Sequence, residues 1–317
     1  MKDWYDSFLG ALFKKYPKKS QLTEALMDLL GIERESVYRR LRKEIMFPTH
    51  EIAKIAFAWS ISLNEIVGVK SNEILFKTQL WNYLNPSDED LDNMRFLVED
   101  SEYTRNLPDT ECMEISNKLP RMLITGFPYL SRFYLLKWNY QYCNDEILPF
   151  SKLIYPDEVY QLSEKYYMVS KTLKTVSFIL DHNITNELVD DIRYFHSILL
   201  VSDEEKELIK NDLHTALNYM SEVAAKGCWL ETGNKVNIYI SHLSIDTNYS
   251  YYHSDMLKFC CVHAFGKNEI ISRDSAMVEN FINWMQSKKR SSFLISEAGE
   301  RSRIEFFTKQ QKIIDDL

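Results

Sequence analysis

The sequence predicts a mainly α protein with an α+β C-terminal part. Helical patterns follow one another through the first 70 residues and recur later, whereas a period of two appears near residues 236–240 and 257–265. A length of 317 residues with 45% apolar content is sufficient for two domains. We therefore expect an all-α head over residues 1–70. A larger helical domain over residues 71–317 should contain a small antiparallel sheet.

The helices of the head are predicted from apolar spacing and from residues that end helices. In the third helical pattern, Val37, Leu41 and Ile45 fall at i, i+4 and i+8 and form one narrow stripe that should pack against the head. Its charged residues project to the other side. The residues expected to separate or end the five helices of the head are Pro17, Gly31, Pro48 and Gly68.

Charge is distributed unevenly between the two parts. Residues 1–70 hold 12 Lys and Arg against 9 Asp and Glu, a net charge of +3, so the remainder of a chain with net charge −8 carries −11. A basic segment beside an acidic domain is typical of a protein whose head binds a polyanion. On charge alone, a solvated helix face is the alternative.

Two short helices separated by Gly31 and Ile32, the second with cations on its outward side, have the order of a helix-turn-helix. A recognition helix needs short polar residues and Arg to reach base edges, and Arg or Lys to hold phosphates. The predicted base-reading residues are Glu35, Ser36, Tyr38 and Arg39. The predicted phosphate contacts are Arg34, Arg40, Arg42 and Lys43, with intramolecular carboxylates as alternative partners of Arg34 and Arg40.

The stretch LTEALMDLLGIERESVYRRLRKEIMFPTHEIAKIAFAWSISLNEIVG resembles the helix-turn-helix domains of phage-repressor-like (XRE-type) regulators, in their Bacteroidetes-type variant with a Tyr-Arg-Arg recognition helix. The resemblance covers roughly residues 20–68 and implies double-stranded DNA as the partner. Members of the family usually have Gly at the position of Lys43 and Ser or Thr at that of Glu33. Lys43 could extend the helix by a turn, and Glu33 should weaken its N-cap. The rest of the chain resembles no family.

A heptad stripe is the strongest periodicity of the second part. It predicts one long helix, either in the core of a monomer, which the sparse e and g charges favour, or at a dimer interface. Because one helix-turn-helix reads few base pairs, we predict a homodimer held through this surface. The dimerisation candidates are Val159, Leu162, Tyr166, Val169, Leu173, Val176 and Leu180.

Other segments of the second part have simpler patterns. Residues 72–84 and 203–227 are predicted helices, the first linking the two domains. Strands are predicted at residues 236–240 and 257–265, the latter leading through a turn at 266–268 into a hairpin.

Motifs for chemistry are weak. In "Cys260-Cys261-x-His263", strand alternation places Cys261 and His263 on one face and Cys260 on the other, so a buried strand is preferred over a metal site. Residues 249–253 read as ordinary packing of a half-buried strand, with a small-molecule pocket as the alternative. We find no catalytic elbow, P-loop or glycine-rich phosphate loop, and predict neither an enzyme nor a cofactor or metal.

Five unpaired cysteines, the lack of a signal-peptide pattern and the lack of a long apolar run predict a cytoplasmic protein without a membrane span. We predict a sequence-specific DNA-binding transcriptional regulator whose C-terminal domain dimerises, senses a signal such as a small-molecule effector, or does both. The alternatives are a protein-interaction adaptor whose head binds an acidic partner, and an enzyme tethered to DNA. An enzyme would require a pocket with converging titratable groups.

Overall fold

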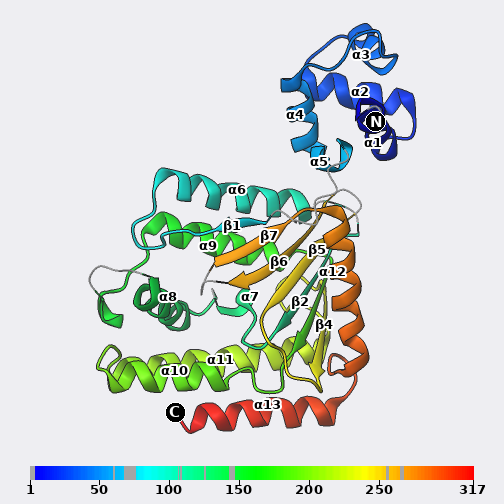
Figure 1. Cartoon of the computed structure of the whole chain (residues 1–317). Coiled ribbons are helices and arrows are strands. Elements are labelled where there is room, and N and C mark those ends of the chain that lie inside the picture. Colours follow the sequence, from blue (N-terminus) through cyan, green and yellow to red (C-terminus); the bar gives the residue numbers. More distant parts are fainter. Residues whose placement is uncertain are drawn as a thin grey trace. The chain divides into compact units, whose positions relative to one another are not determined.

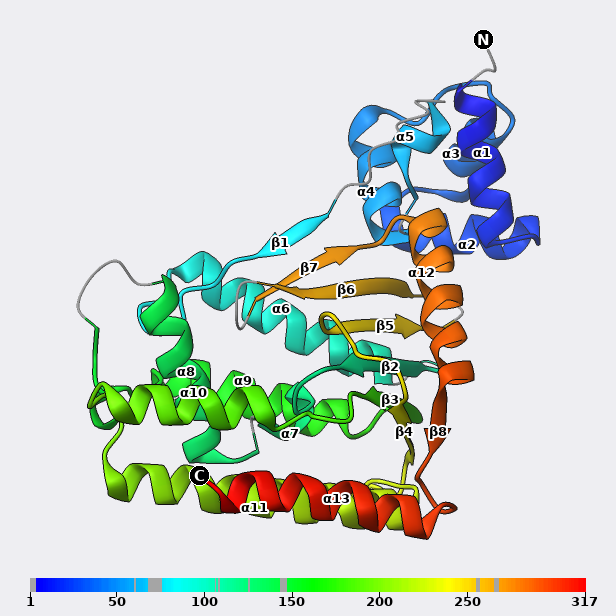
Figure 2. The same cartoon turned by 60° about the horizontal axis from the view of Figure 1, so that its bottom comes forward.

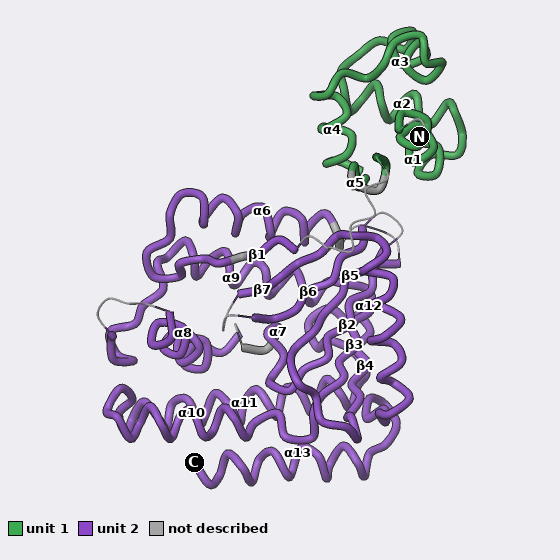
Figure 3. The backbone as a smooth tube through the Cα atoms, in the orientation of Figure 1, with its two compact units in different colours: residues 1–75 green, residues 76–317 purple. Residues whose placement is uncertain are grey.

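The computed structural model describes residues 4–59, 61–67, 76–105, 107, 109–124, 126–142, 147–254, 257–264 and 268–317. The chain divides into two compact units, Met1–Leu75 and Phe76–Leu317 (Figure 3). The predicted boundary at residue 70 falls within residues 68–75, which lie outside the described residues. None of the helices in the described part of the chain is long and apolar enough to cross a membrane.

The described residues of unit 1 form a small helical bundle. Its core consists of apolar side chains from all five helices, with Phe8, Leu12, Leu22 and Leu26 fully buried. The phenol of Tyr5 donates to the carbonyl of Arg40 and accepts from the amide of Phe47, which joins the first helix to the segment after the third. The helices are α1 (Trp4–Lys15), α2 (Lys19–Leu30), α3 (Arg34–Leu41), α4 (Thr49–Trp59) and α5 (Leu63–Ile66).

Unit 2 is built around an eight-stranded mixed sheet, with the strand order β1-β7-β6-β5-β2-β3-β4-β8 among the described residues (Figure 1). Strands β2, β3 and β4 are parallel, and the other neighbouring pairs are antiparallel. The strands are β1 (Lys77–Gln79), β2 (Glu111–Ser116), β3 (Thr175–Leu180), β4 (Lys235–Ser241), β5 (Tyr249–His253), β6 (Lys258–Ala264), β7 (Asn268–Ser272) and β8 (Ser292–Leu294).

The predicted fold class is therefore wrong, because the chain has an α/β fold rather than a helical domain with a small antiparallel sheet. The strands that were not predicted are the parallel strands β2 and β3 and the short edge strands β1 and β8. In β2 and β3 the last five residues of each strand are all buried, so neither strand shows the polar alternation that marks a half-exposed strand.

Helices cover both faces of the sheet (Figures 1 and 2). One face packs against α12, whose Val278, Phe281 and Met285 contact Met113 and Tyr251. The other face carries the main core of the unit beneath the remaining long helices. The helices are α6 (Asp88–Arg105), α7 (Arg121–Ile124), α8 (Pro128–Tyr142), α9 (Asp157–Ser170), α10 (Asn186–Ser197), α11 (Asp203–Lys226), α12 (Ser275–Lys288) and α13 (Glu300–Asp315), with 3-10 turns η1 (Phe150–Lys152) and η2 (Lys289–Ser291).

The heptad stripe does not lie on one helix. Helix α9 ends at Ser170, and Val176 and Leu180 belong to the buried strand β3. The run Thr175–Leu180 is rich in β-branched and aromatic residues, and both of its neighbours pair with it in parallel. Val159, Val169, Leu173, Val176 and Leu180 are buried in unit 2, while Leu162 and Tyr166 are half-buried. The stripe is therefore core and not a dimerisation surface.

The predicted linking helix over residues 72–84 is also wrong. Residues 72–75 lie outside the described residues, and Lys77–Gln79 form the edge strand β1, which pairs with β7. By contrast, the helix predicted over residues 203–227 is confirmed as α11, which begins with a Ser202/Glu205 capping box and ends at Gly227 in the left-handed conformation.

Candidate functional site

The first candidate site is the surface of α3. Helix α2 ends at Gly31, whose φ of 67° allows its amide to bond the carbonyl of Met27, and α3 follows after a short turn. Val37 and Leu41 are buried and hold α3 against the core of the unit. Ile45 is half-buried but lies beyond the end of the helix.

The ends of α3 differ from the expected ones in one respect. The helix stops at Leu41, and Lys43 takes the left-handed conformation with φ 64°, so Lys43 does not extend it. Lys43 therefore occupies the backbone conformation for which Gly is best suited. At the other end, the side chain of Glu33 makes no capping hydrogen bond with the described residues.

The four predicted base-reading residues lie on α3. Glu35 and Arg39 are exposed, whereas Ser36 and Tyr38 are half-buried. The ring of Tyr38 lies 5.3 Å from the Lys19 ammonium. Glu35 accepts a 2.8 Å hydrogen bond from Arg42.

Arg40 differs from the other predicted phosphate contacts. Its guanidinium bonds both carboxylate oxygens of Glu51, at 2.7 and 2.8 Å, and also donates to the carbonyl of Ser36. The Arg40 side chain is 12% exposed, and Glu51 is 9% exposed. Arg40 thus has the intramolecular carboxylate partner that the sequence analysis gave as the alternative to a phosphate.

The remaining cations of this surface are about half exposed, and each has a carboxylate nearby. Glu44 lies 3.5 Å from Arg39 and 3.0 Å from Arg42. Lys43 pairs with Asp6, and Arg34 lies 3.9 Å from Glu24. Exposed ion pairs of this kind contribute about 0 to 1 kcal/mol, so an incoming phosphate can replace the carboxylate.

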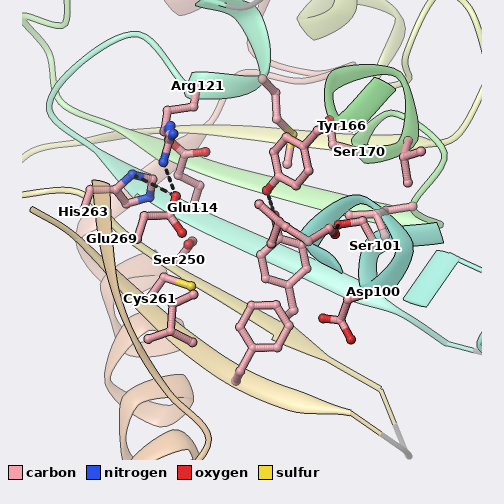
Figure 4. Close-up of a pocket in the computed structure, with 17 residues that line it drawn as sticks. Asp100, Ser101, Glu114, Arg121, Tyr166, Ser170, Ser250, Cys261, His263 and Glu269 are labelled. Carbon is pink, nitrogen blue, oxygen red and sulfur yellow. Dashed lines mark hydrogen bonds and ion pairs between the residues drawn. The ribbon is translucent and has the colours of Figure 1, made fainter. Parts of the chain in front are cut away.

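A second candidate site is a cavity of about 40 Å³ in unit 2, between the sheet and helices α6, α7 and α9 (Figure 4). Cross-strand pairing sets Glu114 beside Ser250, and Ser250 beside Cys261, on one face of the sheet. His263 lies opposite Glu269 in the register of β6 and β7. The cavity thus brings β2 together with the consecutive strands β5, β6 and β7, which lie more than 100 residues later in the sequence.

Figure 4 shows Glu114, His263 and Glu269 gathered around the guanidinium of Arg121. Arg121 forms an ion pair with Glu269, and His263 Nδ1 lies 3.8 Å from the same carboxylate. Burial alone would raise the pKa of Glu269, but Arg121 and His263 offset this effect and the pKa lies below its ordinary value.

Glu114 and His263 have pKa values that are strongly shifted by burial. Burial raises the pKa of Glu114 to about 8 and lowers that of His263 to about 4, so both groups are mostly neutral at pH 7. Glu114 Oε1 and His263 Nε2 are buried and have no hydrogen-bond partner among the described residues. Unsatisfied buried polar atoms are unusual, and two in one cavity indicate a site that an additional group completes.

Part of this site was predictable. Cys261 and His263 lie on one face of β6, and Cys260 packs on the other face, as strand alternation predicts. The alternative interpretation of residues 249–253 also fits, because Ser250 and Tyr252 line the cavity. Glu114, Glu269 and Arg121 were not predicted from the sequence. A signal for the two carboxylates was a Glu within each of the apolar strands ECMEIS and NEIIS.

Among the described residues, no group of three or more His, Cys, Asp or Glu side chains is arranged to hold a metal ion. Cys112, Cys260 and Cys261 are buried free thiols and Cys228 is half-buried, whereas Cys143 lies outside the described residues. The chain matches no family model, and neither a curated protein nor a solved structure matches it.

Proposed function

We propose that the chain is a sequence-specific DNA-binding transcriptional regulator of the cytoplasm, and that unit 1 contacts double-stranded DNA through α3. The observation that carries the proposal is the exposed face of α3 and the turn after it, where Arg34, Arg39, Arg42 and Lys43 are each about half exposed. The resemblance to XRE-type helix-turn-helix domains covers the same residues.

In this proposal the two kinds of contact have separate roles. Phosphates replace the carboxylates beside Arg34, Arg42 and Lys43 and supply affinity that does not depend on sequence. Base edges are read from the exposed face of α3 by Glu35 and Arg39, with Ser36 and Tyr38 at its flanks. The mechanism is equilibrium binding and not catalysis.

The test is binding of the full chain to duplex DNA over a range of salt concentrations. If each copy replaces counterions at about three phosphates, log K should fall against log salt with a slope of about −3 per copy. Selection of bound sites from random duplexes should then return one preferred sequence. Absence of salt-dependent binding to any duplex would contradict the proposal and favour an adaptor whose head binds an acidic protein.

A DNA-tethered enzyme is the second candidate, because unit 2 holds converging titratable groups at one cavity. The chemistry of those groups favours binding. Burial raises the pKa of the Cys261 thiol well above its ordinary value, so the thiolate that a nucleophile requires is not formed near pH 7.

Two copies joined at a fixed spacing would supply the discrimination that one recognition helix lacks. We therefore retain a homodimer as part of the proposal, held through a surface other than the buried stripe. Sedimentation of the full chain should give a dimer at concentrations well above a dissociation constant of about 1 μM. If the chain stays monomeric at all of these concentrations, the homodimer is contradicted, and the proposed DNA binding is not.

A further inference from the structure

The cavity of unit 2 holds one buried carboxyl group without an ionic partner among the described residues. Arg121 is paired with Glu269, and Asp100 at the same cavity lies 3.2 Å from Arg273. Glu114, which is 3% exposed, forms no ion pair among the described residues and has an unpartnered Oε1. Glu114 therefore has no positive partner of its own among these residues that would stabilise its ionised form.

His263 adds a second hydrogen-bond acceptor that lacks a donor among the described residues. Its Nδ1 lies 3.8 Å from the Glu269 carboxylate, which favours the tautomer with the ring proton on Nδ1 and leaves Nε2 as an acceptor. Nε2 is buried without a partner among the described residues. A group that donates hydrogen bonds and carries positive charge would satisfy both Glu114 and His263.

A second cavity of about 70 Å³ adjoins the first and shares Leu97, Met122 and Tyr166 with it. Trp81, Tyr83 and Met94 add apolar and aromatic walls. The first cavity has room for about three water molecules and the second for a few more, so a ligand would have a small polar head and a compact apolar body.

We infer that unit 2 binds a small apolar primary amine, with its ammonium group between Glu114 and His263 and its hydrocarbon body beside Leu97 and Met122. An anionic head would meet two carboxyl groups, and the one guanidinium at this end is already paired with Glu269. With a neutral head Glu114 would stay protonated, so proton release distinguishes an amine from a neutral ligand.

Amine binding has a measurable consequence in protons. The titratable groups around Glu114 are Arg121, Glu269, His263, Cys112 and Cys261, and Ser250 lies beside it in the sheet. At pH 7 the Glu114 carboxyl is mostly protonated, because burial raises its pKa to about 8. An ammonium group favours the carboxylate, so each bound amine should release close to one proton.

The test is isothermal titration calorimetry of the full chain without DNA, so its outcome is independent of the proposed DNA binding. The probes are n-butylamine and benzylamine, compared with 1-butanol, benzyl alcohol, butyrate and benzoate. We expect at least one amine to bind with a dissociation constant of about 1 mM or tighter, and its alcohol and acid to bind at least about tenfold more weakly. Titrations in two buffers of different ionisation enthalpy should give the proton release.

Glu114→Gln keeps the side-chain volume and removes the charge, so it should weaken amine binding by at least about tenfold and abolish proton release. Glu222→Gln, at an exposed position of α11, should change neither. Failure of both amines to bind at about 10 mM would overturn the inference and leave a cavity filled with water. Equal binding of the alcohols or acids would also overturn it. If Glu114→Gln does not fold, the unmodified chain still tests the inference: amine binding without proton release would overturn it.

Discussion

Arg40 and Glu51 form a bidentate ion pair beneath the surface of α3, with two hydrogen bonds of 2.7 and 2.8 Å and little exposure of either side chain. The pair joins α3 to α4, and the backbone carbonyl of Arg40 also accepts a hydrogen bond from the Tyr5 phenol. The last residue of the Tyr-Arg-Arg sequence, Arg40, thus stabilises unit 1, while Arg39 and Arg42 are exposed.

Arg40→Ala should destabilise unit 1 by about 3 to 5 kcal/mol, because it leaves the buried Glu51 carboxylate without its partner. Hydrogen exchange of peptides from residues 34–59 in the full chain would show faster opening. Arg34→Ala is the matched control and should change stability by less than about 0.5 kcal/mol. Native exchange in Arg40→Ala together with weaker DNA binding would instead identify Arg40 as a phosphate contact.

Lys43→Gly should stabilise unit 1 by about 1 kcal/mol, because Gly adopts a φ of 64° without the strain that a Lys side chain causes. The lost pair with Asp6 is half exposed and offsets little of this gain. The same variant should bind all DNA sequences more weakly and reduce the salt slope by about 1. Lys43→Ala, which keeps the strain, should lose the DNA contact without the gain in stability.

The helices of unit 1 were predictable because Gly31, Pro17 and Pro48 separate short amphipathic patterns, each of which packs one face. The secondary structure of unit 2 was harder to predict from the sequence. The spacing from Val159 to Leu180 matched a heptad repeat, although it spans the end of α9 and a wholly different element, β3. In a strand buried on both faces, apolar residues are not confined to alternate positions, so some of them also fit a helical period.

The candidate sites show the same limit. Strand alternation was enough to place Cys261 beside His263, because both lie on one strand. Their proximity to Glu114 and Glu269 depends on the order of the strands in the sheet, in which β5 lies between β2 and β6. Sequence spacing carries no information about that order.

Arg39→Ala should relax the preference at one base position and cost about 1 to 3 kcal/mol on the preferred sequence, because Arg39 is exposed on α3 and positioned to reach a base edge. Binding to random duplexes should weaken much less. The measurement is selection from random DNA, followed by titration of single-base variants. Equal losses on preferred and random DNA would show that Arg39 contacts a phosphate.

Glu44→Gln should increase affinity for all duplexes, because it removes the carboxylate that competes with phosphate for Arg39 and Arg42. The increase should be largest at low salt, where charges on the surface are least screened. Glu300→Gln makes the same charge change at an exposed position of unit 2 and should have a smaller effect. An unchanged affinity in Glu44→Gln would indicate that these arginines do not approach the DNA.

The stability of unit 2 should fall between about pH 6.5 and 8, and Glu114 should account for the fall. The pKa of Glu114 is raised from 4.5 to about 8 in the folded state, so between these values the folded chain holds a proton that the unfolded chain has lost. Raising the pH through this window therefore reduces the free energy of unfolding by up to about 1.4 kcal/mol per pH unit.

His263 acts in the opposite direction. Its pKa falls from 6.5 to about 4 on folding, so its contribution to the free energy of unfolding rises with pH in that range. The two effects oppose each other between about pH 4.5 and 6.5, which leaves the Glu114 effect alone above pH 6.5. Denaturant unfolding from pH 5 to 8 measures the profile. Glu114→Gln should remove the decline above pH 6.5, while Glu222→Gln should retain it, and a wild-type profile that stays level to pH 8 would show that Glu114 is ionised in the folded protein.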